Sequence, residues 1–367
     1  MKRYVHEKIN YVQNSSQNDE HILIVPGVRT EVIRRDRSRV YSIRSPLVPR
    51  LSGYRALLNL RALAEIIGRE KPDIVESSDP YQLGWKAASL GKSRRIPIVA
   101  FYHSHFSEAY LRGPARILRR AAERYVCALY NRFEVTFVPS EPLARTLEGW
   151  GVQNVRTVKL GVNTNIFSPQ PDDRAQTRNS LGLSQGKPLL IYVGRLSPEK
   201  NTRTLFAAWE TLTKRRPREF ELLVIGSGPE LEKLHQLQRR TGNVKWLRYC
   251  EDPLELARFY RAADLFVHPG TQETFGLASL ESQACGTPVV GIRGSRMDQI
   301  ILHEQNSWAA ENTPEALARA VEEFSRKDLR TIGRVAAEAV ALHYSWSRVF
   351  DGLFCIYRDV CTKYRKS

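Results

Sequence analysis

The chain has 367 residues, of which 42% are hydrophobic and 26% are charged, a composition typical of globular proteins that excludes an intrinsically disordered chain. The formal net charge is +17, and residues 1–180 hold 29 Lys and Arg against 17 Asp and Glu, so most of the excess lies in the first half. Such a basic surface favours anionic partners, although a solvated surface explains the charge equally well.

The sequence contains no segment that would cross a membrane or form a disulfide framework. No apolar run reaches the roughly 18–20 residues needed to span a bilayer, and the N-terminal segment has no apolar signal core. The five cysteines form no CxxC pair, so neither disulfides nor a zinc knuckle are indicated. We therefore expect a cytoplasmic protein.

From residue 51 onward, helical and strand patterns alternate. Apolar residues at helical spacing predict a helix over 54–70, and a buried strand follows over 72–77. The remaining elements of this series are helices over 82–91, 115–132 and 141–151 and strands over 95–103, 134–140 and 155–160. Strands separated by helices of this length predict a parallel α/β sheet.

A change of composition separates this series from a second one. Residues 168–188 are polar and proline-rich, which indicates an interdomain linker with a short helix. The strands of the second series are predicted over 189–194, 220–226, 244–249, 265–269 and 287–292, with helices between them. Two such series predict two Rossmann-like domains that face each other across a cleft.

The stretch ETFGLASLE carries Glu273 and Glu281 directly after the strand over 265–269. Open α/β sheets bind ligands at the carboxyl ends of their strands. A helix that begins near Phe275–Leu277 would direct free N–H groups toward that edge, where they can hold a phosphate, and Gly276 would allow close approach. Glu281 would then reach sugar hydroxyls. The competing interpretation is an ordinary pair of acids near a helix N-terminus.

Two other positions are candidates. The loop VGRLSPEKN places Arg195 and Lys200 after Gly194, and two cations on one strand-to-helix loop suit a diphosphate, although a solvated basic loop is commoner. His103 ends a strand of the first domain, where it would exchange a proton or bind a substrate hydroxyl. His105 is the competing candidate, and a structural histidine is the alternative. No DxD or HExxH motif and no close His/Cys cluster is present, so no metal is expected. A GxSxG nucleophile elbow is also absent.

Taken together, GRLSPEKN, IGSGPE and ETFGLASLESQACGTPVV resemble the second domain of family 4 retaining glycosyltransferases of the GT-B fold. The last run matches that family's motif of two Glu separated by seven residues. The resemblance covers essentially the whole chain and is closest over 157–292. Before the helix that begins the chain, the family's first strand and glycine-rich loop are missing, so the first domain is expected to lack that strand. Asn163 stands where Asp is usual, and Asp298 where Glu is common.

The resemblance implies transfer of a hexosyl unit from a nucleotide-diphosphate sugar to a hydroxyl of an acceptor. The basic charge of the first half suggests that this acceptor is a glycan or a lipid-linked molecule of cell-envelope glycan synthesis. Arg195 and Lys200, after Gly194, would bind the diphosphate. Glu281 would bind the ribose, and Glu273 the hydroxyls of the donor sugar.

The same resemblance places the remaining contacts. The backbone around Phe275, Gly276 and Leu277 would meet the distal phosphate, and the base would lie against Tyr249 and Cys250. His103 would lie on the acceptor side. The catalytic residues would therefore be His103, Glu273, Arg195 and Lys200, with no metal and no other cofactor.

The implied domains are an acceptor-side domain over 1–165, a nucleotide-sugar domain over 166–342 and a helix over 343–367 that crosses back to the first. An arginine-rich helix of the first domain suits docking on an anionic membrane surface at the inner face of the plasma membrane. Its residues are Arg112, Arg116, Arg119, Arg120 and Arg124 around Ile117, Leu118, Tyr125 and Val126. A solvated helix face packed on the sheet is the alternative.

Other functions remain open from the sequence. A nucleotide-sugar epimerase can share this architecture, and the missing strand makes an inactive nucleotide-sugar-binding copy credible. A glycoside hydrolase is rejected, because both acids belong to one loop–helix unit beside a phosphate-type site. Only the charge suggests nucleic acid, and no nucleic-acid motif supports it, so no such partner is expected.

Overall fold

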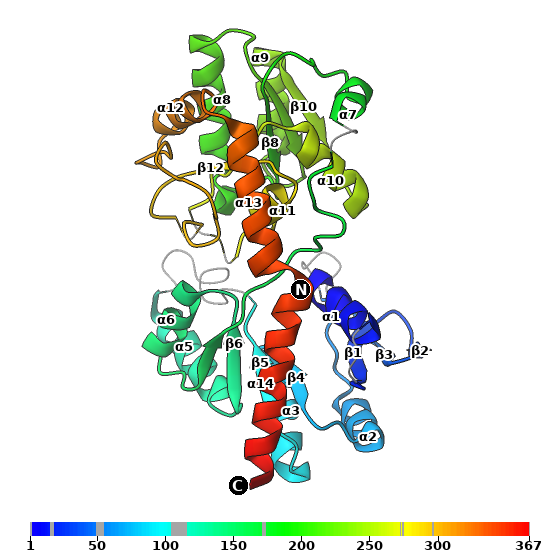
Figure 1. Ribbon diagram of the computed structural model, residues 1–367. Helices are drawn as coiled ribbons and strands as arrows, with labels where there is room; N and C mark the ends of the chain where they lie inside the picture. The colour runs from blue at the N-terminus through cyan, green and yellow to red at the C-terminus, as the bar shows by residue number, and fades with distance from the viewer. Residues whose placement is uncertain are drawn as a thin grey trace. The chain divides into compact units, whose positions relative to one another are not determined.

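The computed structural model describes residues 2–14, 18–48, 55–103, 116–170, 174–271, 273, 275–295 and 297–366. The chain divides into two compact units (Figure 1). Unit 1 comprises Met1–Lys159 and Val349–Ser367, and unit 2 comprises Leu160–Arg348. Both are built from helices and mainly parallel strands, which confirms the α/β fold class.

Unit 1 begins with a helix and a small sheet. Helix α1 (Lys2–Asn14) precedes β1 (His21–Gly27), β2 (Glu31–Arg34) and β3 (Ser38–Arg44). The strand order is β1-β3-β2, with β1 parallel and β2 antiparallel to β3, so β2 is an edge strand. The hydrophobic pattern of this part of the sequence does not predict these strands.

A second sheet of unit 1 is wholly parallel, in the order β4-β5-β6-β7. Its strands are β4 (Val75–Ser77), β5 (Ile98–Phe101), β6 (Val135–Val138) and β7 (Val155–Thr157). The helices are α2 (Leu60–Glu70), α3 (Gln82–Arg94), α5 (Arg116–Tyr130), α6 (Glu141–Gly149) and α14 (Trp346–Lys366), and Figure 1 shows α14 lying along β4 and β6. All residues of β5 and β6 are buried, as expected of central parallel strands.

The helix predicted over 54–70 begins later than expected. It starts at Leu60, because the side chain of Asn59 accepts a hydrogen bond from the backbone N–H of Ala62 at 3.0 Å and caps the first turn. The apolar residues before Asn59 continue the pattern without being helical: Leu57 is buried and Leu58 is exposed.

The two sheets of unit 1 are not joined. Among the described residues no strand ladder connects β1 to β4, and β1 is only half-buried although it reads HILIVPG. Within the described residues, the strands of unit 1 therefore form two sheets and not one.

Unit 2 contains one five-stranded parallel sheet in the order β10-β9-β8-β11-β12. The strands are β8 (Leu189–Val193), β9 (Glu221–Ile225), β10 (Val244–Leu247), β11 (Leu265–Val267) and β12 (Val289–Val290). The chain moves from β8 to β9 on one side and later returns to β11 on the other. The point between β8 and β11 is therefore the topological switch point at which such sheets bind ligands.

Helices surround this sheet. They are α7 (Arg174–Ser180), α8 (Thr202–Arg215), α9 (Leu231–Thr241), α10 (Pro253–Ala262), α11 (Leu277–Ala284), α12 (Pro314–Phe324) and α13 (Leu329–Tyr344), with a 3-10 turn η1 (Pro198–Lys200) before α8. The sequence analysis does not predict α12 and α13. Figure 1 shows α8 and α12 side by side.

The described part of the predicted linker from Arg174 onward is packed on unit 2. Arg178 on α7 is 1% exposed, and its guanidinium donates to the carboxylate of Asp264 at 2.6 Å and to the carbonyls of Ala262 and Lys187. Asp264 in turn accepts from the backbone N–H of Leu189 at 2.7 Å. A buried guanidinium with several acceptors fixes the chain just before β8.

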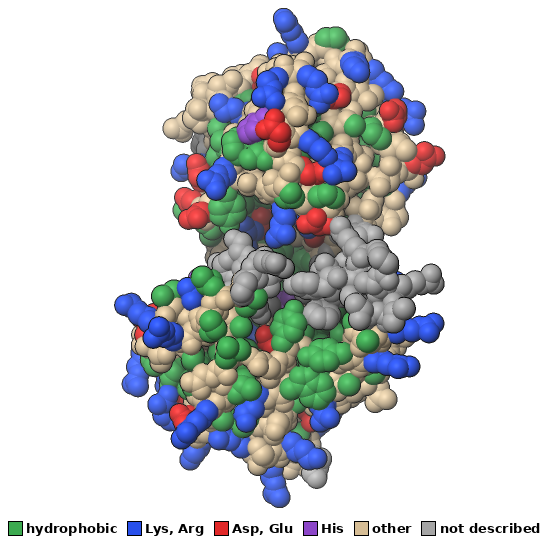
Figure 2. All heavy atoms as spheres, turned by 180° about the vertical axis from the view of Figure 1, so that it is seen from behind, with side chains coloured by type: hydrophobic (Ala, Val, Ile, Leu, Met, Phe, Trp, Pro, Cys, Tyr) green, Lys and Arg blue, Asp and Glu red, His purple; other side chains and the backbone are tan. Residues whose placement is uncertain are grey.

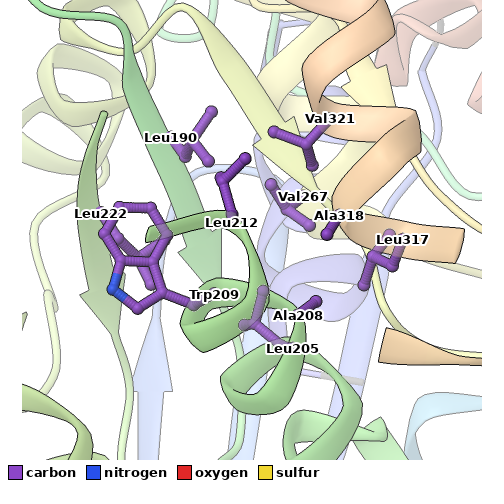
Figure 3. A pocket seen from close by; sticks show the side chains of 10 residues that line it. All are labelled: Leu190, Leu205, Ala208, Trp209, Leu212, Leu222, Val267, Leu317, Ala318 and Val321. Atoms are coloured by element: carbon purple, nitrogen blue, oxygen red, sulfur yellow. The ribbon is translucent and has the colours of Figure 1, made fainter. Parts of the chain in front are cut away.

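A cavity of about 10 Å³ lies between α8, α12 and the sheet. Figure 3 shows that its lining comes from β8, β9, β11 and the two helices. The lining side chains are apolar except for the indole N–H of Trp209, which donates to the hydroxyl of Thr241 at 3.1 Å. A space of this size barely holds one water and offers no polar partner to it. It is a packing gap, and none of the predicted site residues contributes to it.

Candidate active site

The loop after β8 is held by close backbone packing against the loop after β9. The N–H of Gly194 donates to Ile225 O at 3.0 Å, and that of Leu196 donates to Ser227 O at 3.1 Å. A Cβ on Gly226 would lie 1.9 Å from the carbonyl oxygen of Gly194, so only glycine fits there. The two predicted motifs GRLSPEKN and IGSGPE therefore form one structural unit.

A buried acid anchors this unit. Glu230 is 2% exposed, accepts hydrogen bonds from Thr202 and Arg203, and forms an ion pair with Lys233 at 3.2 Å. Burial raises the pKa of Glu230, but the bonds from these three side chains outweigh it and hold the pKa below the ordinary value. The backbone N–H of Glu230 also donates to Leu196 O at 3.0 Å, which fixes the loop that presents Lys200.

Lys200 meets Glu273. The ammonium donates to both carboxylate oxygens, at 2.8 Å and 2.7 Å. Lys200 is at the end of η1 after β8, and Glu273 is in the loop after β11, the neighbouring strand. The structure thus brings together a predicted diphosphate-binding cation and a predicted sugar-binding acid.

The stretch after Glu273 leads into α11 through a left-handed residue. Gly276 has φ +79° and precedes Leu277, the first residue of α11, while Phe275 is buried. A Cβ on Gly276 would lie 2.4 Å from the sulfur of Met297. The helix begins where the sequence analysis predicts it, and its first N–H groups lie next to the Glu273 loop.

His268 connects β11 to the start of α11. It directly follows β11, is 7% exposed, and its Nδ1 lies 3.3 Å from the hydroxyl of Ser279 in the first turn of α11. Burial lowers the pKa of His268 to about 4, and the charge of Glu273 opposes this shift. The imidazole is therefore neutral near pH 7. Its Nε2 is buried and lies beside the backbone of Gly270.

The other predicted donor-site residues lie in contrasting environments. Glu281 on α11 is 3% exposed, and Tyr260 donates a hydrogen bond to its carboxylate at 3.3 Å. Tyr249 is 71% exposed, whereas the neighbouring Cys250 is buried, and burial raises the pKa of its thiol to about 12. The side chain of Arg195 is 70% exposed and lies 3.7 Å from Glu199. An exposed guanidinium on a fixed loop can turn toward a ligand at little cost.

His103 belongs to unit 1, whereas the other candidates belong to unit 2. Its ring stacks on Phe101 with centroids 4.1 Å apart, and its Nε2 lies 3.4 Å from the hydroxyl of Ser78. Burial lowers the pKa of His103 to about 3, although Glu76 opposes the shift. The ring is neutral near pH 7 and suited to hydrogen bonding. The competing His105 lies outside the described residues.

Two family models together match most of the chain. The one described as Glycosyltransferase Family 4 matches residues 1–166, and Glycosyl transferases group 1 matches residues 173–337. A GDP-mannose-dependent alpha-(1-6)-phosphatidylinositol dimannoside mannosyltransferase of Mycobacterium tuberculosis is 31% identical over 338 residues, which cover 90% of this chain and 85% of that protein. The chain belongs to the family 4 glycosyltransferases. It is accordingly a glycosyltransferase by family, as the resemblance implies.

Solved structures agree on the fold of this glycosyltransferase. A sucrose-phosphate synthase from Thermosynechococcus elongatus superimposes with a TM-score of 0.77 at 21% identity, covering 98% of this chain and 93% of that one. Anabaena HepE in complex with UDP-glucose gives a TM-score of 0.67 at 18% identity, covering 84% and 82%. These likenesses confirm the GT-B fold.

Three features of the site are not predicted from the sequence. His268 and Glu230 are buried polar residues whose contacts depend on tertiary packing, and the pairing of Lys200 with Glu273 depends on strand order. The only available signal was position, since His268 ends a strand and Glu230 precedes a helix. Within the described ranges, no group of three or more His, Cys, Asp or Glu is arranged to hold a metal ion.

Proposed function

We propose that this glycosyltransferase moves a hexosyl unit, with retention of configuration, from a nucleotide-diphosphate sugar to a hydroxyl of a glycan or lipid-linked acceptor. The observation that carries the proposal is the contact of Lys200 with Glu273 at the carboxyl ends of β8 and β11, beside the start of α11. This combines a cation, a sugar-binding acid and free N–H groups at the switch point.

Each residue has a physical role in this proposal. Negative charge develops on the leaving diphosphate, and Lys200, Arg195 and the first N–H groups of α11 would stabilise it without a metal. Glu273 keeps the ammonium oriented and would accept hydrogen bonds from donor-sugar hydroxyls. Glu281 would contact the ribose, and neutral His103 would bind a hydroxyl on the acceptor side.

The base subsite follows the same reasoning. Tyr249 is exposed and presents a ring on which a base can stack, whereas the Cys250 side chain is engaged by Asp252 and Glu255. We assign the stacking contact to Tyr249, and only the backbone next to Cys250 to the base.

A thermal-shift panel tests donor binding, since a ligand that binds only the folded state raises the melting temperature. GDP-mannose and UDP-glucose come first, because the Mycobacterium relative is named for one donor and the Anabaena structure holds the other. We expect one nucleotide-sugar to stabilise the chain and the variant K200M to lose this shift. Lys214→Met, an exposed lysine at the end of α8, should keep it. No shift with any nucleotide-sugar would overturn the proposal.

Incubation with the donor alone distinguishes the alternatives. An epimerase would alter the sugar without an acceptor, and an inactive copy would bind the donor with neither hydrolysis nor transfer. The family models and the mannosyltransferase relative favour transfer. If transfer occurs, the anomeric configuration of the product tests retention.

The acceptor proposal includes peripheral attachment of a cytoplasmic protein to the inner face of the plasma membrane. The name of the Mycobacterium relative supports a lipid-linked acceptor. None of the described helices is both long and apolar enough to span a bilayer. The arginine-rich helix gives limited support, because Val126 is fully buried in the core of unit 1 and Tyr125 packs against that core while donating to Pro80 O.

A further inference from the structure

Exposed large hydrophobic side chains are concentrated in one short segment of unit 1. Ten are exposed among the described residues, and five of them lie between residues 28 and 58. These five are Val28, Val32, Ile33, Leu47 and Leu58. Val28 is 72% exposed and Ile33 is 49% exposed. Single exposed apolar residues need no explanation, but a local concentration does.

The strand register places four of these residues at one end and along the outer edge of the small sheet. Gly27 pairs with Arg44, so Val28 and Leu47 both follow the carboxyl ends of the parallel strands β1 and β3. The antiparallel β2 starts at the same end, since Glu31 pairs with Ser42, and it runs along the outer edge of the sheet to Arg34, which pairs with Arg39 at the other end. Its Val32 and Ile33 project to opposite sides of that edge, so the residues of β2 present the edge itself. An edge strand with apolar side chains is normally covered or protected by charge.

Arginines accompany these apolar residues. Arg29, Arg34, Arg35 and Arg44 are all exposed, and within the described residues only Arg29 has an ion-pair partner, Glu31 at 2.8 Å. Glu31 and Asp36 are the only acids between positions 28 and 48. Figure 2 shows Lys and Arg scattered widely over the face it draws, so charge alone does not single out this segment. The combination of free guanidinium groups with exposed apolar side chains distinguishes this segment.

We propose that this hairpin patch, defined as Val28, Arg29, Val32, Ile33, Arg34, Arg35, Arg44 and Leu47, docks on an anionic lipid bilayer. The apolar tips would enter the boundary between headgroups and acyl chains, and the guanidinium groups would bind lipid phosphates. Headgroups and water would satisfy the open N–H and C=O groups of β2. A nucleic acid would use the arginines but would leave the apolar side chains in water, so the bilayer is favoured.

Vesicle flotation at low salt tests the proposal with the whole chain. The probes are vesicles of phosphatidylcholine with about one-third phosphatidylglycerol and vesicles of phosphatidylcholine alone. We expect binding to the anionic vesicles only, decreasing as salt rises. R34Q/R35Q should weaken binding by at least about tenfold, because each basic residue near an anionic surface contributes about 1 kcal/mol. V32T/I33T should weaken it by several fold while keeping β-branched residues in the strand.

Matched controls separate the patch from general charge and hydrophobicity. V335Q/L342Q changes two exposed apolar residues of α13, and K214Q/R215Q changes two exposed cations at the end of α8. Both should bind as the unmodified chain does. R119Q/R120Q/R124Q tests the helix α5 as the docking surface instead.

Several outcomes would overturn the proposal. The first is that R34Q/R35Q and V32T/I33T bind as the unmodified chain does, and the second is that only R119Q/R120Q/R124Q loses binding. The third is that V335Q/L342Q or K214Q/R215Q loses as much binding as the hairpin variants, and the fourth is that the unmodified chain does not bind anionic vesicles. If the hairpin variants lose binding to a single-stranded oligonucleotide but still bind vesicles, the patch is assigned to nucleic acid instead. Unchanged melting temperatures of the hairpin variants exclude misfolding as the cause. This inference rests on the peripheral attachment included in the proposed function and names the surface that makes it. Because no transfer is measured, failure of vesicle binding is distinguishable from failure of the proposed glycosyl transfer.

Discussion

The ammonium of Lys200 and the carboxylate of Glu273 form a two-point ion pair, at 2.8 Å and 2.7 Å, between loops that follow neighbouring strands. The side chain of Lys200 is 32% exposed and that of Glu273 is 14% exposed, so the pair is accessible to a ligand from one side. A ligand phosphate would compete with Glu273 for the ammonium. The ion pair therefore offers a ligand a cation and a hydrogen-bond acceptor at the same point.

Removing either partner should affect transfer differently. K200M should lower kcat/KM by about 100-fold or more, because it removes a charge that stabilises the leaving diphosphate. E273Q keeps the size of the side chain and should mainly lower kcat, since Lys200 remains. The measurement is release of nucleoside diphosphate with the donor identified by thermal shift. Equal rates for K200M and the unmodified chain would contradict the assigned role.

Gly276 should tolerate no side chain. In G276A the Cβ would lie 2.4 Å from the sulfur of Met297 and the residue would be left-handed, at φ +79°. We expect a loss of at least about 2 kcal/mol, of which the left-handed conformation accounts for about 1 kcal/mol. G182A is the matched control, because Gly182 has φ +67° but nothing within 4 Å of its Cβ position. Urea unfolding should rank G276A well below G182A, and M297A should restore part of the difference.

Unit 2 should become less stable in mild acid because of His268. Burial lowers the pKa of His268 to about 4, below the value of about 6.5 in an unfolded chain. Between these values the unfolded state binds a proton that the folded state does not, so stability falls as the pH drops. The slope for one such group is at most about 1.4 kcal/mol per pH unit. H268M should remove this slope, as measured by urea unfolding at about pH 7 and about pH 5. An identical pH dependence in H268M would show that the group does not contribute.

The buried pair of Lys8 and Glu76 should be important for unit 1. Lys8 is 4% exposed, lies 3.1 Å from Glu76 on β4 and donates to the hydroxyl of Tyr357 on α14 at 2.7 Å. K8M should cost about 3–5 kcal/mol, because it leaves a buried carboxylate unpaired. K8M/E76Q removes that charge and should recover part of the loss in a thermal melt. A double variant no more stable than K8M would show that packing, not charge, explains the effect.

Hydrophobic alternation predicted the repeating elements of the fold. The strands β8 and β9 lie within a few residues of their predicted bounds, and the helices α8 and α10 lie between strands as predicted, because buried parallel strands are short apolar runs between amphipathic helices. Helix α12 was missed although Thr313 and Pro314 mark its start, and Thr313 caps it with a bond from Ala316 N at 3.3 Å.

The small sheet was harder to predict. Strand β2 is a four-residue edge strand with two exposed apolar residues and ends in Arg34, so no clean alternation marks it. The sequence pattern also does not predict which side chains of different loops meet. That Lys200 meets Glu273 follows from β8 lying next to β11, and hydrophobic pattern carries no information on strand order.

Unit 1 has two separate sheets among its described residues, whereas unit 2 has one, so unit 1 is expected to unfold less cooperatively than unit 2. Strands β1, β2 and β3 share no ladder with β4 among the described residues, and their cohesion with the remainder depends on side chains such as Ile66 of α2, which packs against Tyr41 and Ile43. A small sheet held only by side-chain packing can unfold locally while the parallel sheet of β4 to β7 stays folded. The small sheet is then a region of low protection, whose backbone amides exchange with solvent before those of the fully buried β5 and β6.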